Sequence, residues 1–501
     1  MNRRDFIKTS SIVTLPLLLK SCGWQDEGQP FPVHVHSDAA TGHLVYQSNQ
    51  YERITGESVE VVIVGGGIAG LAAACKLKDR DFLLFELSNT LGGTSAAYRS
   101  EELTFAQGAH YDMGYPQSYG SEVLDLLESL NIISYQPWKE EWGFTDQEHL
   151  VMHRRKNQCY DHGEIRKEVI KAGRLRDRFF ELLKPYQGQM HLPTRLIDAK
   201  YRPLDRISFV DFLGKNLDLN DQFLAWVGYH TKDDYGADAH AVSALAGIHY
   251  FTCRPYNSEI VELFSPPEGN HYFINKMADR VGGDRLKPNH LVKHITETPN
   301  GFRIEVIDTI NQQVRMVTAK KVVYAGQKHA LKYIFPKDAP LFANNLYAPW
   351  MVVNLVLERS ADNWGYWQNE MLTRDETFLG FIDSTTQHKA SPRHRVLTAY
   401  YCLPPSSRND LVNVEATKNQ IAESTAQHIS NYWGKDIRPT LRQVDIKVMG
   451  HAMPIPGKGY LFDDKNQYRK NSNIVYAGVD NSRLPLLFEA VDSGIMAAEM
   501  I

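Results

Sequence analysis

The first predicted elements lie between residues 59 and 95, where continuous apolar runs alternate with glycine-rich turns. Val61–Val64 and Phe82–Phe85 are uninterrupted apolar runs. Runs of this length and composition predict strands that are buried on both faces of a parallel sheet. The alanine-rich residues 71–77 between them favour a helix. The pattern therefore predicts strand, turn, helix and strand in succession.

Later segments show periodic patterns of apolar and polar residues. Residues 285–325 contain polar and apolar alternation around a Pro-Asn-Gly turn at 299–301, which predicts a meander of antiparallel strands. Apolar residues recur at helical spacing in 169–186 and 207–215, and 350–357 is another apolar strand. A chain of 501 residues with this mixture predicts an α/β fold of two or three interleaved subdomains.

Composition narrows the class of protein. Hydrophobic residues make up 43% and charged residues 23%, as in globular proteins. The net charge of −4 lacks the basic excess of proteins that bind phosphate backbones, so no nucleic-acid partner is expected. The five cysteines show no CxxC spacing, and His34 and His36 have no further ligand nearby, so no metal site is predicted.

Residues 1–24 resemble an export signal. Arg3 and Arg4 precede a short apolar run, which is typical of the twin-arginine signal that delivers folded proteins to the periplasm through the twin-arginine export machinery. Cys22 resembles the acceptor of a lipoprotein signal, so the choice between a free periplasmic protein and one attached to a membrane by a lipid stays open. Residues 25–56 are polar and turn-rich and predict a linker or strap.

Residues 65–70 fit the GxGxxG spacing of a dinucleotide site. The first glycine permits a tight turn, Gly67 lets the backbone approach a pyrophosphate, and Gly70 allows helix and strand to pack closely. The N-terminus of the following helix directs free N–H groups at the phosphates. An acidic residue about 20 residues further on contacts the ribose. The predicted contacts are Gly65, Gly67, Ile68, Ala69, Gly70 and Glu86.

Further segments resemble the superfamily of flavin amine oxidases, phytoene desaturases and protoporphyrinogen oxidases. Residues 91–94 resemble its second glycine pair, 105–111 its segment beside the flavin ring, and 474–480 and 489–498 its closing strand, turn and helix. The resemblance spans the mature chain and implies a Rossmann-like fold that binds FAD. The additional FAD contacts that it implies are Gly92, Gly93, Thr94, Gly108, Ala109, Val292, Gly478, Val479, Asp480, Ala490 and Val491.

The resemblance also implies a domain plan. Residues 57–150, 276–330 and 446–501 would form the FAD-binding domain, which contains a parallel sheet and a β-meander. Residues 151–275 and 331–445 would form an α+β substrate domain interleaved with it.

For function, the resemblance implies an oxidoreductase that takes a hydride from the C–N bond of an amine or amino acid onto flavin N5. A small-molecule substrate and oxygen or a periplasmic electron acceptor would be its partners. Amine-oxidising relatives use a lysine near the flavin, and Asn354 stands at the matching position. His110 is the second catalytic candidate, because a histidine beside the flavin can orient substrate or take a proton. A desaturase or isomerase of an apolar substrate, and a non-catalytic electron-relay flavoprotein, remain as alternatives.

Overall fold

The computed structural model describes residues 31–100, 103–108, 116–152, 158–161, 164–166, 173–253, 262–358, 367–373, 375–387, 393–469 and 472–501. The predicted export signal, with Arg3, Arg4 and Cys22, lies outside these residues and stays a prediction.

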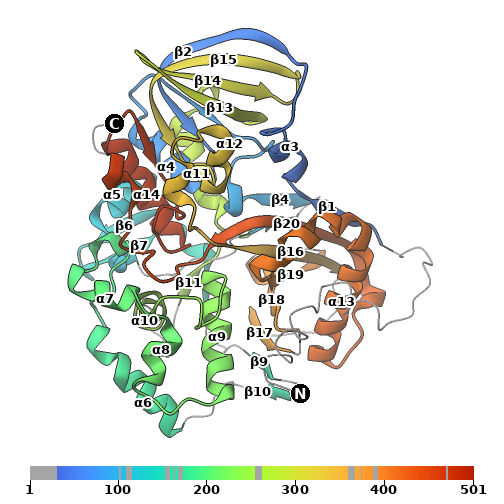
Figure 1. Cartoon of the computed structure of the whole chain (residues 1–501). Helices are drawn as coiled ribbons and strands as arrows, with labels where there is room; N and C mark the ends of the chain where they lie inside the picture. Colours follow the sequence, from blue (N-terminus) through green and yellow to red (C-terminus); the bar gives the residue numbers. More distant parts are fainter. Residues whose placement is uncertain are drawn as a thin grey trace, which may run out of the picture.

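A seven-stranded sheet forms the upper part of the molecule in Figure 1. Its core is parallel, in the order β3-β2-β15-β21, and β15 continues into the antiparallel meander β15-β14-β13. The strands are β2 (Glu52–Val64), β3 (Phe82–Phe85), β12 (Leu286–Lys287), β13 (His290–Thr298), β14 (Gly301–Asp308), β15 (Gln313–Tyr324) and β21 (Ile474–Tyr476). The predicted strands at 61–64 and 82–85 and the hairpin around 299–301 are therefore confirmed.

Helices cover both faces of this sheet. On one face lie α4 (Ile68–Lys76), α5 (Ser121–Ser129), α11 (His271–Val281) and α14 (Leu487–Glu499), and on the other lies the short α12 (Leu331–Ile334). Val61 and Ile63 of β2 pack on the first layer, and Val62 and Val64 pack on the second. This division explains the uninterrupted apolar run, because successive strand residues point to opposite faces and both faces are buried.

An eight-stranded sheet lies beside the first, in the order β1-β20-β16-β19-β18-β17-β9-β10. Helix α13 (Val414–Trp433) packs on it (Figure 1). The strands are β1 (Val33–His36), β9 (Gln158–Asp161), β10 (Glu164–Arg166), β16 (Tyr347–Glu358), β17 (Gln368–Leu372), β18 (Phe378–Asp383), β19 (His394–Cys402) and β20 (Leu441–Pro454).

Two predicted boundaries differ from this arrangement. Residues 33–36, expected within a linker, form the edge strand β1 and pair with β20, because alternate residues there are buried against α13. The boundary expected at 446 falls inside β20, which continues without a break to Pro454. A single sequence shows where a strand is polar, but not which sheet it joins.

The remaining helices form the lower left of Figure 1: α6 (Arg174–Leu183), α7 (Arg202–Asp205), α8 (Phe209–Gly214), α9 (Asp221–Tyr235) and α10 (Ala244–Thr252). They confirm the helices predicted in 169–186 and 207–215. Three two-stranded antiparallel sheets and a short helix complete the described strands and α-helices: β4 (Ala97–Ser100) with β5 (Leu103–Ala106), β6 (Ile133–Gln136) with β7 (Glu141–Phe144), β8 (Leu150–Met152) with β11 (Glu262–Phe264), and α3 (Ala39–His43).

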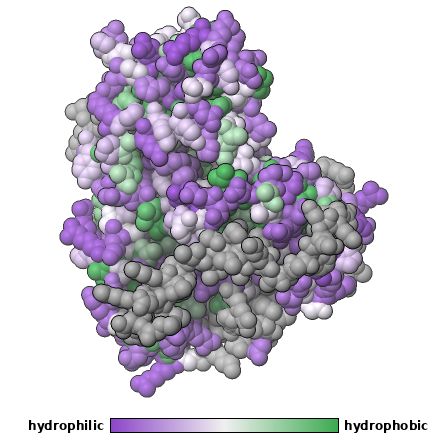
Figure 2. All heavy atoms as spheres, turned by 45° about the vertical axis from the view of Figure 1, so that its right-hand side comes forward, coloured by the Kyte–Doolittle hydropathy of each residue, from purple (hydrophilic) through white to green (hydrophobic). Residues whose placement is uncertain are grey.

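The surface in Figure 2 is mostly hydrophilic, with apolar residues in small scattered groups. Isolated apolar residues of this kind are normal on a folded protein. Within the described residues, no helix is both long enough and apolar enough to cross a membrane.

Candidate active site

The predicted motifs meet at one edge of the seven-stranded sheet. The register aligns Val64 with Phe85, Tyr324 with Val64, and Tyr324 with Tyr476. Four parallel strands therefore end side by side. In open α/β sheets, ligands bind outside the carboxyl ends of the strands, which makes this edge the candidate site.

The turn between β2 and α4 has the geometry that its three glycines predict. Gly65 has φ of +99°, which glycine adopts without strain. A Cβ atom at Gly70 would lie 1.9 Å from the Gly65 carbonyl oxygen, so a side chain there would force the helix off the strand. Among the described residues, the nearest atom to a Cβ at Gly67 would be the Gly92 oxygen, at 3.8 Å. Gly67 therefore borders open space, and Gly70 does not.

The second glycine pair lies against this turn. The N–H of Gly92 donates to the Gly66 carbonyl at 2.9 Å, and a Cβ atom at Gly93 would have the Gly67 Cα as its nearest neighbour, at 3.7 Å. A Cβ atom at Gly108 would lie 1.9 Å from the Thr94 carbonyl oxygen. The structure therefore brings together three glycine segments that are separated in the sequence.

Glu86 follows β3 at the same edge and is buried. Its carboxylate accepts the N–H of Gly66 at 2.7 Å and the N–H of Ser88 at 2.8 Å. Burial raises the pKa of Glu86, although both hydrogen bonds favour the charged form. The N–H of His290 donates to the Glu86 backbone carbonyl at 2.7 Å, which places the start of β13, and with it the buried Val292, near the end of β3.

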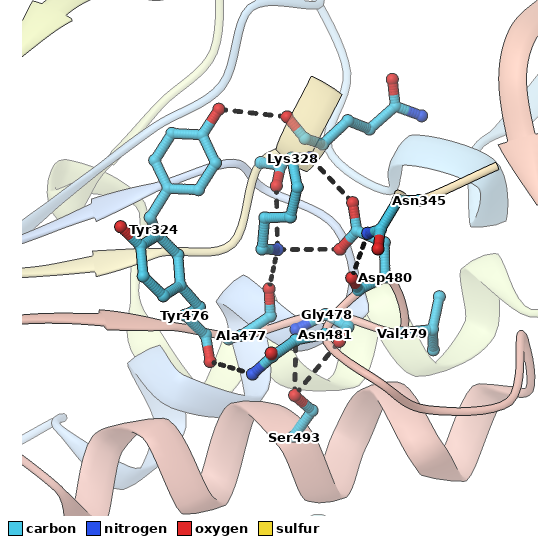
Figure 3. Close-up of polar contacts among 12 residues, drawn as sticks. Tyr324, Lys328, Asn345, Tyr476, Ala477, Gly478, Val479, Asp480, Asn481 and Ser493 are labelled. Atoms are coloured by element: carbon cyan, nitrogen blue, oxygen red, sulfur yellow. Dashed lines mark hydrogen bonds and ion pairs between the residues drawn. The ribbon is translucent and has the colours of Figure 1, made fainter. Parts of the chain in front are cut away.

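The turn after β21 is held by a buried ion pair (Figure 3). The ammonium of Lys328, in the 3₁₀ turn Lys328–Ala330, lies 2.8 Å from Asp480 Oδ1. Asp480 Oδ2 accepts the backbone N–H of Lys328 at 2.8 Å and the hydroxyl of Tyr347 at 3.0 Å. Burial and the charge of Asp480 raise the pKa of Tyr347, so the phenol keeps the proton that it donates.

The sequence matches the protein family described as "Flavin containing amine oxidoreductase" over residues 68–501. The chain belongs to this family. It is accordingly an FAD-dependent oxidoreductase, and the α/β fold expected from the sequence is confirmed. A comparison with curated proteins finds no match.

Solved structures of similar fold include three oxidases. Putrescine oxidase bound to putrescine has a TM-score of 0.61 and 14% identity, covering 89% of this chain and 99% of the other. Cyclohexylamine oxidase from Brevibacterium oxydans has a TM-score of 0.60 and 14% identity, covering 88% and 98%. A proposed protoporphyrinogen oxidase from Exiguobacterium has a TM-score of 0.63 and 16% identity, covering 89% and 98%. At these identities the likeness concerns the fold.

The residues at the carboxyl edge of this flavin-containing oxidoreductase fit a dinucleotide. Gly67 and Gly93 border the same open space, so a pyrophosphate can approach the backbone there. The first N–H groups of α4 have no intrahelical acceptor. Within the described residues, the N–H groups of Val479 and Asp480 have no hydrogen-bond partner either. Donors from both turns are thus available to an anionic group.

Other predicted contacts are used by the chain itself. The N–H of Ala490 donates within α14 to the Leu486 carbonyl at 3.1 Å, and the Val491 side chain packs in the core. The carboxylate of Asp480 points at Lys328 (Figure 3), so its backbone is the part available to a cofactor. Ala109 and His110 lie outside the described residues.

Asn354 lies in β16 and is fully buried. Its Oδ1 accepts the hydroxyl of Thr398 at 2.7 Å, and its Nδ2 donates to the Ala106 carbonyl at 3.4 Å. Because Ala106 comes two residues before Gly108, Asn354 connects the eight-stranded sheet to the segment that resembles the flavin-flanking one. Asn354 has no amine, and its amide oxygen and nitrogen are both hydrogen-bonded within the chain, so it cannot act as a lysine would.

Lys328, Tyr347 and Ser493 were not predicted from the sequence, although all three contact the turn after β21. Figure 3 shows the contacts of Lys328 and Ser493. The only signal for Lys328 is its place four residues after the last residue of a buried strand, at the ligand edge of the sheet. Nothing in the spacing indicates that its partner, Asp480, lies 152 residues away.

Proposed function

We propose that this enzyme oxidises the C–N bond of an amine or amino acid, with FAD extended along the carboxyl edge of the seven-stranded sheet. The open space shared by Gly67 and Gly93 carries the cofactor part of the proposal, and the N–H groups of Val479 and Asp480, which have no partner within the described residues, support it. The names of two relatives, putrescine oxidase and cyclohexylamine oxidase, support an amine as the substrate class.

Each segment then has a role in binding. The two carboxylate oxygens of Glu86 each accept one N–H, which leaves lone pairs for ribose hydroxyls. The backbone at Val292 lies on the adenine side. The pyrophosphate lies over Gly67, Gly93 and the first turn of α4, and the N–H of Val479 reaches it from the other side. Thr94 and Gly108 lie toward the flavin, and Ala109 and His110, which lie outside the described residues, remain predicted contacts.

When bound, FAD supplies a two-electron acceptor that takes a hydride from the substrate carbon beside the nitrogen. The task of this chain is to hold the substrate C–H over that acceptor and to exclude water. Asn354 contributes through Ala106, because it fixes the backbone that leads into the flavin-flanking segment. His110 is our candidate for orienting the substrate or taking a proton. Oxygen or a periplasmic acceptor then receives the electrons.

One observation favours a second candidate, a desaturase or isomerase of an apolar substrate. The lysine of amine-oxidising relatives is replaced by Asn354, whose amide oxygen and nitrogen each have a partner within the chain. A site without that lysine can serve C–C chemistry, in which no amine has to be presented.

Anaerobic reduction of the purified yellow protein separates these candidates. Polyamines, monoamines and amino acids are added in turn while flavin absorbance near the visible maximum is followed. We expect one of the amine classes to bleach the flavin. Bleaching by apolar compounds alone would favour the desaturase, and reduction by dithionite alone would indicate an electron relay. A correctly folded protein that refuses FAD on reconstitution would contradict the cofactor site itself.

A further inference from the structure

Lys328 is a buried cation outside every predicted motif. Its side chain is 0% exposed. The ammonium donates to Asp480 Oδ1 at 2.8 Å, to the Ala477 carbonyl at 2.5 Å and to the Gly326 carbonyl at 3.1 Å (Figure 3). An ammonium has three donors, so each one has an acceptor within the chain. Lys328 is therefore fully used for structure and cannot itself bind substrate.

The three acceptors belong to two neighbouring strand ends. Gly326 follows β15, and Ala477 and Asp480 follow β21, which pairs with β15 in parallel. The ammonium thus ties the loop after one strand to the turn after the next. Both lie at the edge where the FAD contacts are proposed.

The turn is held from further sides as well. Asn345 Nδ2 donates to the Asp480 carbonyl at 2.7 Å, and Tyr347 donates to its carboxylate at 3.0 Å. Ser493 Oγ of α14 accepts the N–H of Gly478 at 3.0 Å. These bonds use the side chain of Asp480 and the N–H of Gly478, and they leave the N–H groups of Val479 and Asp480 free within the described residues.

A buried ion pair adds little net free energy of folding. Desolvation of two charges offsets most of their attraction, and well-packed apolar residues of similar volume often do as well or better. What the pair adds is geometry, because a tripod of hydrogen bonds from one ammonium fixes three oxygens in one arrangement. The contacts of Lys328 fix the turn that carries the N–H groups available to the proposed pyrophosphate.

We propose that Lys328 is a positioning residue for FAD. It clamps the turn of residues 477–481 to the loop after β15 and holds the Asp480 carboxylate away from the cofactor, so that backbone N–H groups bind the pyrophosphate. The proposal rests on the proposed function, in which FAD lies across this edge.

The test compares two kinds of variant in the full chain. Lys328→Met leaves the Asp480 carboxylate buried and unpaired, so we expect a lower melting temperature of the apoprotein and an FAD dissociation constant raised by about tenfold or more. The double variant Lys328→Met/Asp480→Leu removes both charges. We expect its apoprotein to recover most of the melting temperature, while its FAD dissociation constant stays raised by about tenfold.

The dissociation constants are measured by flavin fluorescence quenching well below the melting temperature of each apoprotein. A merely structural role changes the melting temperature and leaves these constants alone, so a double variant with the dissociation constant of the unsubstituted protein would overturn the proposal. Tyr347→Phe removes one hydroxyl and keeps the ring, and we expect about a threefold weaker FAD affinity. Should the Lys328 variants not fold, unchanged affinity in Tyr347→Phe would overturn the proposal by itself.

Lys447→Met is the matched control. Lys447 forms an ion pair with Asp38 at 2.8 Å in the eight-stranded sheet, where β1 meets β20, and the variant should bind FAD with unchanged affinity. Failure of the proposed function looks different from failure of this inference. In the first case the unsubstituted protein does not bind FAD at all. In the second it binds FAD and the Lys328 variants bind it equally well.

Discussion

The two turns at the proposed FAD site are built by different means. Backbone atoms build the turn at 65–70: Gly65 supplies a positive φ, Gly70 a close approach and Gly67 an open flank. Side chains build the turn at 477–481, through Lys328 and Asp480. A Cβ atom at Gly478 would lie 3.2 Å from the Lys328 ammonium and 3.1 Å from Asp480 Oδ1. A glycine therefore makes room for a ligand in the first turn and for the chain itself in the second.

The largest effect should come from Gly67→Val. Valine fits the extended backbone of Gly67, with φ of −77° and ψ of −176°, and its side chain would occupy the open space where the pyrophosphate is proposed. We expect FAD affinity to fall by more than about 100-fold, or about 2.7 kcal/mol of binding free energy. Losing glycine at the N-cap costs the apoprotein only about 1 kcal/mol. Reconstitution with FAD and thermal unfolding of the apoprotein check both numbers.

Gly70→Ala is the control for that variant. Its Cβ atom would meet the Gly65 carbonyl at 1.9 Å, so the apoprotein itself should be destabilised, whether or not FAD is present. A Gly67→Val protein that is fully loaded with FAD would refute the placement of the pyrophosphate.

The next largest effect is expected in the turn at 477–481. Gly478 has φ of +118°, and alanine there would be strained as well as pressed against the ion pair. We expect Gly478→Ala to lower the free energy of unfolding by about 2–3 kcal/mol in the apoprotein. Urea unfolding measures the change.

Gly434→Ala provides the comparison, because Gly434 also has a positive φ, of +64°, but no described residue other than its chain neighbours lies within 4 Å of the Cβ position. That variant should cost about 1 kcal/mol, from backbone strain alone. Equal losses in the two variants would show that the clamp does not fill the space beside Gly478.

The difference between the two turns explains which of them could be predicted from the sequence. The first turn depends on residues within one short segment, so the glycine spacing, the buried strands and Glu86 were readable together. The second turn joins Lys328, Tyr347, Asp480 and Ser493, which are brought together only when β15, β16, β21 and α14 have packed. A resemblance located Asp480 but could not show that its carboxylate points at a lysine.

Asn354 shows why the role of a candidate catalytic residue could not be predicted from the sequence. Its place opposite the family lysine could be aligned, but its partners Thr398 and Ala106 lie 44 and 248 residues away. Hydrogen bonds of this kind follow from the pairing of β16 with β19 and from the packing of the two sheets. Local spacing carries no signal for them, so the role of the residue was open until the fold was known.

The smallest expected effect comes from a pair of serine variants that distinguish folding stability from FAD binding. Ser493 and Ser430 are both buried serines of long helices whose Oγ accepts a backbone N–H, from Gly478 at 3.0 Å and from Ile437 at 3.1 Å. Replacing either by alanine leaves a buried N–H without its acceptor, which costs about 1 kcal/mol of folding free energy. We therefore expect Ser493→Ala and Ser430→Ala to unfold at nearly the same urea concentration.

Their FAD affinities should differ, because only Ser493 holds the turn that is built by side chains. Without it, the N–H of Gly478 is free to seek another acceptor and the neighbouring N–H groups of Val479 and Asp480 lose part of their fixed direction. We expect about a threefold higher FAD dissociation constant in Ser493→Ala and no change in Ser430→Ala, measured by fluorescence titration. If both variants bind FAD as the unsubstituted protein does, the second turn tolerates movement, and the first turn alone determines where the pyrophosphate lies.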